Sequence, residues 1–236
     1  MYNSLVLFVF GLLLIGASGQ DQQPEQSALT KFFYDRCQKY SRDASVYDRL
    51  KADVGDFKKY AKYTATYLPN QVGHFCKLEQ GHLRGRMKAI TTTMTKCLPA
   101  EEHFLGDFVY QSFRGFLHFL CDNEAENVHS FFSSQGSDCR SNINTEEITQ
   151  CFGKIFAPVD GRIQKKELCD NLNVAQKCYS QSLDRHCPNF RAFQKLNQDL
   201  FNYIERPCST SGSKTVLPAV QGIFFALIFC LIRFTY

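Results

Sequence analysis

The sequence predicts an all-α, disulfide-rich helical bundle that forms a single ectodomain. Apolar residues recur at steps of three and four in most segments, no convincing run alternates as a strand would, and ten of the eleven cysteines lie between two apolar ends. The roughly 190 residues between those ends suffice for one core, because a chain of that length buries around 70% of its unfolded surface. Two helical subdomains remain an alternative to one domain.

The chain begins with a predicted signal peptide, residues 1–19. Residues 5–15 are apolar apart from Gly11, and the small residues Ala17, Ser18 and Gly19 follow, which is the pattern that a signal peptidase cleaves. The apolar run is shorter than a typical spanning helix, which needs about 20 residues. We expect cleavage after Gly19 and entry into the secretory pathway.

Residues 20–208 form the cysteine-rich ectodomain, in which the apolar spacing predicts eight helical segments. The segments are 27–40, 45–68, 72–97, 100–121, 124–133, 145–157, 165–186 and 189–205. Pro69 closes the second segment, and Pro99 and Pro188 lie at helix starts, where the missing N–H costs nothing. The last segment carries the clearest apolar stripe, which predicts core: Phe190, Phe193, Leu196, Leu200, Phe201 and Ile204.

Several polar and small residues within these segments receive structural interpretations. Asn144 with Glu147 fits a helix cap. Glu101 and Glu102, like the acidic stretch 122–126, lie at helix starts, where the helix dipole favours carboxylates. Six glycines within helical patterns should weaken or bend their helices: Gly55, Gly73, Gly81, Gly85, Gly106 and Gly115.

The cysteines predict five disulfides. An even set in a secreted chain indicates disulfides rather than metal ligands or redox thiols, and Cys230 lies apart in the C-terminal tail. About 945 pairings of ten cysteines exist, so the connectivity stays open. The ten are Cys37, Cys76, Cys97, Cys121, Cys139, Cys151, Cys169, Cys178, Cys187 and Cys208.

Three of these cysteines constrain the geometry of one helix. Cys169, Cys178 and Cys187 are spaced nine residues apart. On a continuous helix, neighbours in this series lie about 13.5 Å apart along the axis and on opposite faces. A disulfide needs Cα atoms within about 7 Å. All three must therefore pair with cysteines elsewhere and staple the helix on both sides.

The C-terminal end resembles a signal for attachment of a glycosylphosphatidylinositol anchor. A segment of small residues and spacer, 209–218, precedes a tail, 219–236, that is apolar apart from Gln221, Arg233 and Thr235. The spacer length favours Ser209 or Ser211 as the attachment residue. The alternative is a transmembrane helix, although no cluster of Lys or Arg follows it to hold a cytoplasmic side. The expected location is the outer leaflet of the plasma membrane.

No catalytic, cofactor-binding or metal-binding residues are assigned. The six histidines do not form a zinc-type spacing with cysteine, and nucleophile-elbow, P-loop and dinucleotide motifs do not occur. Residues 20–211 hold 25 basic residues (27 minus Lys214 and Arg233) and 23 acidic ones, which gives no footprint for nucleic acid. The basic runs at 58–62 and 84–88 are interpreted as solvated helix faces.

Several short motifs resemble the insect 27 kDa haemolymph glycoprotein family, best over residues 116–208. Cys37, Cys76 and Cys97 fit the same order more loosely. The motifs are Phe119-Leu120-Cys121, Val128-His129-Ser130-Phe131-Phe132, Gly136-Ser137-Asp138-Cys139, Gln176-Lys177-Cys178, Cys187-Pro188 and Ile204-Glu205-Arg206-Pro207-Cys208. The resemblance implies a helical, cysteine-rich, secreted protein with no established catalytic activity, and it supplies no binding residues.

Two features depart from that family. The chain has no Asn-x-Ser/Thr sequon, and its hydrophobic tail favours membrane anchoring over free circulation in haemolymph. We expect a non-enzymatic extracellular interaction protein at the cell surface, whose partner is an unidentified protein. The alternative is a carrier of an apolar small molecule such as a lipid or hormone, in haemolymph or at the membrane.

Overall fold

The computed structural model describes residues 28–142, 145–152, 155–156 and 161–209. Within these ranges every regular element is a helix and no strand occurs, which confirms the predicted all-α, disulfide-rich fold. The predicted signal peptide, Asn144, Ser211 and the C-terminal tail lie outside the described residues.

The helices follow one another along the chain with short connections. They are α2 (Ala28–Tyr40), α3 (Val46–Ala65), α4 (Val72–His74), the π-helix η1 (Phe75–Glu79), α5 (Gln80–Thr95), the 3₁₀ helix η2 (Ala100–Glu102), α6 (Phe104–Cys121), the 3₁₀ helix η3 (Asn123–Ala125), α7 (Glu126–Phe132), α8 (Ser134–Asn142), α9 (Thr145–Phe152), α10 (Lys165–His186), α11 (Arg191–Ile204) and α12 (Arg206–Ser209).

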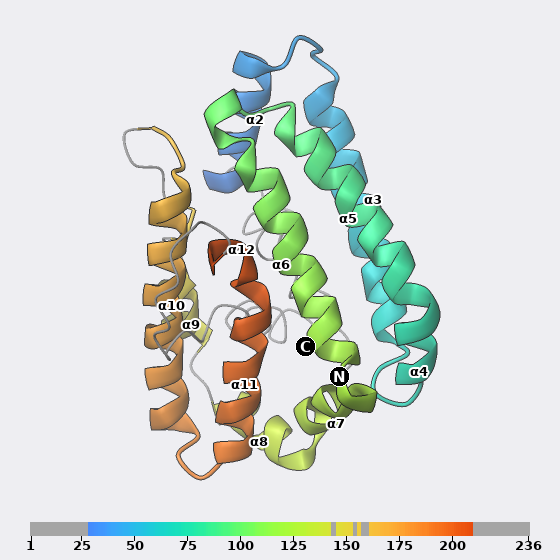
Figure 1. The fold of residues 1–236 in the computed structure, drawn as a ribbon, viewed down its shortest axis with the longest axis vertical. Helices are drawn as coiled ribbons and strands as arrows, with labels where there is room; N and C mark the ends of the chain where they lie inside the picture. Colours follow the sequence, from blue (N-terminus) through green and yellow to red (C-terminus); the bar gives the residue numbers. More distant parts are fainter. Residues whose placement is uncertain (1–27, 143–144, 153–154, 157–160, 210–236) are drawn as a thin grey trace, which may run out of the picture.

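Five long helices pack in the order α3, α5, α6, α11 and α10 (Figure 1). The central helix, α6, buries 11 of its 18 residues because it packs against α5 on one side and α11 on the other. Phe57 of α3 and Phe113 of α6 meet edge to face at 5.6 Å, and both are buried. Each such side chain contributes about 1.5–3 kcal/mol when fully buried, so aromatic packing around α6 is a large part of the core.

The structure departs from the predicted segments at several places, of which three are the most informative. The segment 72–97 is divided into α4, η1 and α5, and the segment 145–157 ends as a helix at Phe152. Helix α8 was not predicted, because its sequence SQGSDCRSN has no apolar stripe. Its Cys139 is fully buried and disulfide-bonded to Cys187, so this disulfide, rather than an apolar stripe, attaches α8 to the rest of the fold.

Two glycines of α6 mark close helix packing rather than weak points. A Cβ atom on Gly106 would overlap the Thr95 side chain of α5, and one on Gly115 would overlap the Tyr203 carbonyl of α11. The expectation that these glycines bend α6 therefore misses their role. Glycine at these positions lets the neighbouring helices approach the α6 backbone.

All ten predicted cysteines form disulfides, and the pairs fall into two groups along the chain. The pairs are Cys37–Cys97, Cys76–Cys121, Cys139–Cys187, Cys151–Cys178 and Cys169–Cys208. The first two lie within residues 28–121, which we call the N-terminal half. The other three lie within residues 122–209, the C-terminal half, and none of the five joins the halves.

Helix α10 is stapled on both sides, as its cysteine spacing predicts. Cys169 binds Cys208 of α12, and Cys178 binds Cys151 of α9. Cys187, which follows the last residue of α10, binds Cys139 of α8. Each of the short helices α8, α9 and α12 is thus tied once to α10 or to its end.

Hydrogen bonds from a buried ion pair of the N-terminal half reach the C-terminal half. The Arg36 guanidinium donates to Glu102 Oε2, and the two side chains are only 9% and 1% exposed. Glu102 Oε1 also accepts the Ile163 N–H at 3.0 Å, and Arg36 donates to the Gly161 carbonyl at 2.6 Å. Glu102 does lie in the first turn of η2, as the helix-dipole interpretation expects, but that interpretation misses its main role, because this buried carboxylate also accepts hydrogen bonds from Arg36 and Ile163.

The acidic stretch 122–126 is only partly what the dipole argument predicts. Glu124 and Glu126 do lie in first helical turns. Asp122 instead accepts the Tyr203 hydroxyl and lies 3.1 Å from His118 Nδ1, so it joins α6 to α11. Similarly, Glu147 contacts Arg185 and His186 on α10, and its predicted cap partner Asn144 lies outside the described residues.

Candidate functional site

Three tyrosines, a histidine and a glutamate gather where α3, α4 and η1 meet. Tyr60, Tyr63 and Tyr67 recur at steps of three and four along α3 and the turn that follows, which brings them to one side. His74 ends α4, and Glu79 ends η1. We call these five residues the tyrosine cluster.

Glu79 is the buried centre of the cluster, with only 8% of the residue exposed. The Tyr60 hydroxyl donates to Glu79 Oε2, and His74 Nε2 lies 3.2 Å from Oε1. A buried carboxylate is costly unless it is paired and hydrogen-bonded. These contacts therefore fix the positions of Tyr60 and His74 as much as they satisfy Glu79.

The rings of the cluster support one another. The hydroxyls of Tyr63 and Tyr67 are 2.6 Å apart, and the Tyr67 and His74 ring centres are separated by 4.4 Å. The Arg86 guanidinium of α5 lies 4.3 Å from the centre of the Tyr60 ring. Tyr63 is nevertheless 55% exposed, so the cluster presents a large, supported aromatic side chain to solvent.

Tyr60 and Tyr67 stay protonated at neutral pH. Burial, followed by the hydrogen bond to Glu79, raises the pKa of Tyr60 to about 12. The hydrogen bond with Tyr63, followed by burial, raises the pKa of Tyr67 to about 12. Phenols with such pKa values do not exchange protons readily near pH 7.

The π-helix η1 carries Glu79 and is anchored to α6. Cys76 of η1 is disulfide-bonded to Cys121 at the end of α6, and Gln80 Nε2 donates to the Leu117 carbonyl at 2.9 Å. Single π-helical turns are rare and are frequent at functional sites. This local geometry is a second reason to consider the cluster as the candidate site.

Sequence reasoning missed the tyrosine cluster. The steps between Tyr60, Tyr63 and Tyr67 are visible in the sequence and could have marked an aromatic face. The burial of Glu79 could not be anticipated, because nothing in the local pattern distinguishes it from a solvated glutamate. Only tertiary packing brings it beneath Tyr60.

The residues that the sequence did single out have a structural role or are untested. The ten cysteines staple the fold, and Ser209 ends α12 with its hydroxyl donating to the Arg206 carbonyl at 2.9 Å. Across the described ranges, no group of three or more His, Cys, Asp or Glu side chains could hold a metal ion. Nor is any helix in that part of the chain long and apolar enough to span a bilayer.

A hollow of about 270 Å³ lies beside the start of α6. It is lined by Phe104, Asp107, Phe108, Gln111, Lys165, Arg206 and Pro207. Its lining mixes two cations with aromatic rings, and its volume falls just below the roughly 300–1,000 Å³ of typical ligand pockets. This hollow is the feature most relevant to a carrier.

Comparisons with known proteins place the chain by family only. No curated protein and no solved structure matches it. A family model described as a protein of unknown function (DUF1397) matches residues 23–209, which are most of the chain and contain all five disulfides. The chain therefore belongs to the DUF1397 family, whose function is unknown.

Proposed function

We propose that this protein is a non-enzymatic interaction protein of the cell exterior, displayed on the outer leaflet by a lipid anchor. The tyrosine cluster carries this proposal. Aromatic and arginine side chains are enriched at the energetic centres of protein interfaces, and rigid ones lose little conformational entropy on binding. Tyr63 is exposed, Glu79 fixes the neighbouring Tyr60, and the Tyr67 hydroxyl shares a hydrogen bond with that of Tyr63, which suits a preformed contact surface.

The extracellular part of the proposal is supported by the five disulfides. Structural disulfides persist in oxidising compartments and are rare in the cytosol. The signal peptide, the anchor and the assignment to the insect haemolymph glycoprotein family are the finer parts of the proposal. They rest on sequence pattern alone.

Anchoring is tested on the full chain expressed in insect cells. Membranes are treated with a phosphatidylinositol-specific phospholipase C, beside a known anchored control protein. Release of a product that ends within the small-residue segment 209–218 supports the anchor. Retention of the chain while the control is released favours a spanning helix, and recovery in untreated medium favours a soluble haemolymph protein.

Partner binding is tested by cross-linking at the surface of expressing cells. We expect Tyr63→Ala to lose at least about tenfold in partner capture, because an exposed interface tyrosine commonly contributes more than 1.4 kcal/mol. Tyr40→Ala is the matched control, since Tyr40 is 38% exposed on α2, outside the cluster. Equal loss in both variants would exclude the tyrosine cluster as the contact surface.

A carrier of an apolar molecule is the second candidate, favoured by the hollow beside α6. Lipid extraction of the purified protein followed by mass spectrometry separates the two. A stoichiometric bound lipid that is lost in Phe108→Ala would support the carrier. An empty protein that still captures a saturable protein partner would support the interaction protein.

A further inference from the structure

The charges of this chain are strongly segregated, although its total is nearly balanced. Residues 57–100 hold eight basic residues and one acidic residue, Glu79. The rest of residues 20–211 then holds 17 basic and 22 acidic residues (25 − 8 and 23 − 1). Helix α5 contains no acidic residue, and Glu79, which directly precedes it, is buried. A sign asymmetry of this kind indicates an anionic partner.

Part of this positive charge lies where α5 and α6 pack against each other in antiparallel directions. Lys88 Nζ lies 4.8 Å from the centre of the Tyr110 ring, and Gln80 donates to the Leu117 carbonyl. These two contacts set the register of the helices, so Arg84, midway between Gln80 and Lys88, lies level with Arg114. We call Arg84, Lys88, Tyr110 and Arg114 the basic seam.

The three cations of the basic seam have no anionic partner. Within the described residues, none of Arg84, Lys88 and Arg114 forms an ion pair or a side-chain hydrogen bond. Arg84 and Lys88 are four residues apart, where like charges destabilise a helix. Other helices pair opposite charges at that spacing, as in Lys31–Asp35, Lys166–Asp170 and Lys195–Asp199. Helix α5 thus maintains a repulsion that an external anion would relieve.

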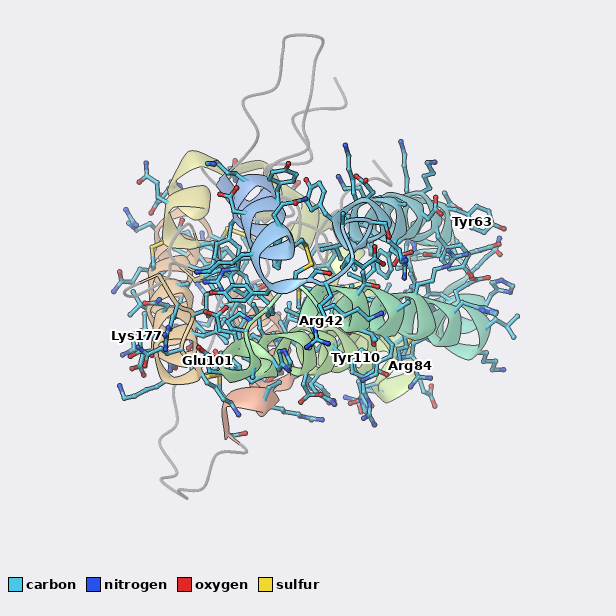
Figure 2. The ribbon with its side chains drawn as sticks, turned by 90° about the horizontal axis from the view of Figure 1, so that it is seen from above. Arg42, Tyr63, Arg84, Glu101, Tyr110 and Lys177 are labelled. Atoms are coloured by element: carbon cyan, nitrogen blue, oxygen red, sulfur yellow. A yellow bond between two sulfur atoms is a disulfide. The ribbon has the colours of Figure 1, made fainter. Side chains whose placement is uncertain are left out.

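The basic seam and the tyrosine cluster are separate surfaces. Arg86 stacks on Tyr60 and Lys88 stacks on Tyr110, and two residues along a helix correspond to a rotation of about 200°. Figure 2 shows the same separation, with Tyr63 on one side of α5 and with Arg84 and Tyr110 on the other. A ligand at the seam therefore leaves the tyrosine cluster accessible.

We propose that the basic seam binds a sulfated polysaccharide. The planar guanidinium groups of Arg84 and Arg114 match a tetrahedral oxyanion with paired N–H donors, and Lys88 adds a point charge held against a ring. Disulfides place this chemistry outside the cell, where sulfated glycans rather than nucleic acids are the common polyanions. A bilayer surface is disfavoured because the exposed large apolar side chains lie elsewhere: Tyr34, Tyr40, Tyr63, Leu78 and Val174.

The test uses the full chain purified from insect cells and immobilised heparin as the sulfated probe. Binding is measured at several salt concentrations for the wild type and for the triple variant Arg84→Gln, Lys88→Gln, Arg114→Gln. We expect the triple variant to bind at least about tenfold more weakly and with a shallower dependence on salt, because fewer counterions are released. Desulfated heparin, with the same sugar backbone, should fail to compete.

The matched control removes three exposed lysines from α3: Lys51→Gln, Lys59→Gln and Lys62→Gln. This variant loses the same net charge and should change heparin affinity less than about twofold. Equal loss in both triple variants, or equal competition by desulfated heparin, would overturn the proposal. Tighter binding to a DNA duplex or to phosphatidylserine vesicles than to heparin would also overturn it.

Two further variants separate binding from folding and from the proposed function. The charge-preserving pair Arg84→Lys, Lys88→Arg should keep most of the affinity, and the exposed single change Arg114→Gln should lose part of it even if the triple variant misfolds. Tyr63→Ala should bind heparin normally. The proposal that the basic seam binds a sulfated polysaccharide can therefore be wrong while the proposed role of the tyrosine cluster is right, and the reverse.

Discussion

The N-terminal and C-terminal halves of the molecule are each stabilised in a different way. The N-terminal half is built from α3, α5 and α6, which are 20, 16 and 18 residues long, and it contains two disulfides. In the C-terminal half, α8, α9 and α12 have only 9, 8 and 4 residues, and three disulfides tie them to α10 or its end. Short helices are marginal by themselves, so covalent ties there substitute for the packing that long helices provide.

Apart from the backbone that joins them, the two halves contact each other only through non-covalent interactions within the described residues. The Arg36–Glu102 pair binds the loop before α10, and the Ser112 hydroxyl donates to the Ile204 carbonyl at 2.9 Å. Gly115 lets α11 approach α6 closely. The comparison teaches that stability at the junction depends on buried polar contacts and close packing, whereas the C-terminal half depends on cross-links.

The largest effect is expected at the buried ion pair. Glu102→Ala should lower the free energy of unfolding by about 3–5 kcal/mol, because Arg36 would remain buried without its partner. Glu101→Ala is the control, since the Glu101–Arg162 pair is exposed and worth at most about 1 kcal/mol. Urea unfolding of both purified variants measures the difference. Similar values would mean that the junction does not depend on this pair.

The disulfides test whether cross-links matter more in the C-terminal half. Cys151→Ser with Cys178→Ser should lower stability by about 2–5 kcal/mol and block secretion, because α9 loses its tie to α10. Loop length alone predicts that losing the Cys76–Cys121 disulfide costs more, because its loop spans 45 residues and the Cys151–Cys178 loop spans 27. Secreted yields of this double variant and of Cys76→Ser with Cys121→Ser decide between these expectations. Cys230→Ser should fold normally, and its misfolding would implicate the tail in the fold.

A smaller effect is expected where α11 crosses α6. Gly115→Ala should destabilise by about 1–3 kcal/mol, because the added methyl group meets the Tyr203 backbone. Gly85→Ala, on the exposed side of α5, meets no atom within 4 Å and should stabilise by about 1 kcal/mol. Thermal unfolding of both variants gives the sign. Stabilisation by both would show that the halves can separate slightly at no cost.

The smallest effect is expected at Glu205, just after α11. Burial raises the pKa of this carboxyl from 4.5 to about 8. The folded state is therefore favoured most below pH 4.5, and that advantage is lost as the pH rises through 8. Glu205→Gln should be more stable than the wild type above pH 8 and equally stable below pH 4.5. Unfolding curves at the two pH values measure the gain, and a pH-independent difference would contradict it.

The sequence predicts the helical class and the two-sided stapling of α10, because apolar spacing and cysteine phase are local properties. It does not predict α8, since SQGSDCRSN lacks an apolar stripe and is held by Cys139. Glu79 and Glu102 escape prediction for a related reason. Their burial depends on partners such as Tyr60 and Arg36, which are 19 and 66 residues away, and no local pattern records such pairs.

Between Cys37 and Cys208, the stretch from Cys121 to Cys139 is the part of the backbone that no described disulfide loop encloses. A single cut inside any disulfide loop leaves one covalently connected molecule. A cut between Cys121 and Cys139, for example beside the exposed Ser133, divides the chain into two pieces that share no described disulfide. Those pieces would stay associated through α6 and α11 and separate in detergent without any reductant. A protease acting in that stretch would release the N-terminal half from a molecule anchored through its C-terminal end, with every disulfide intact.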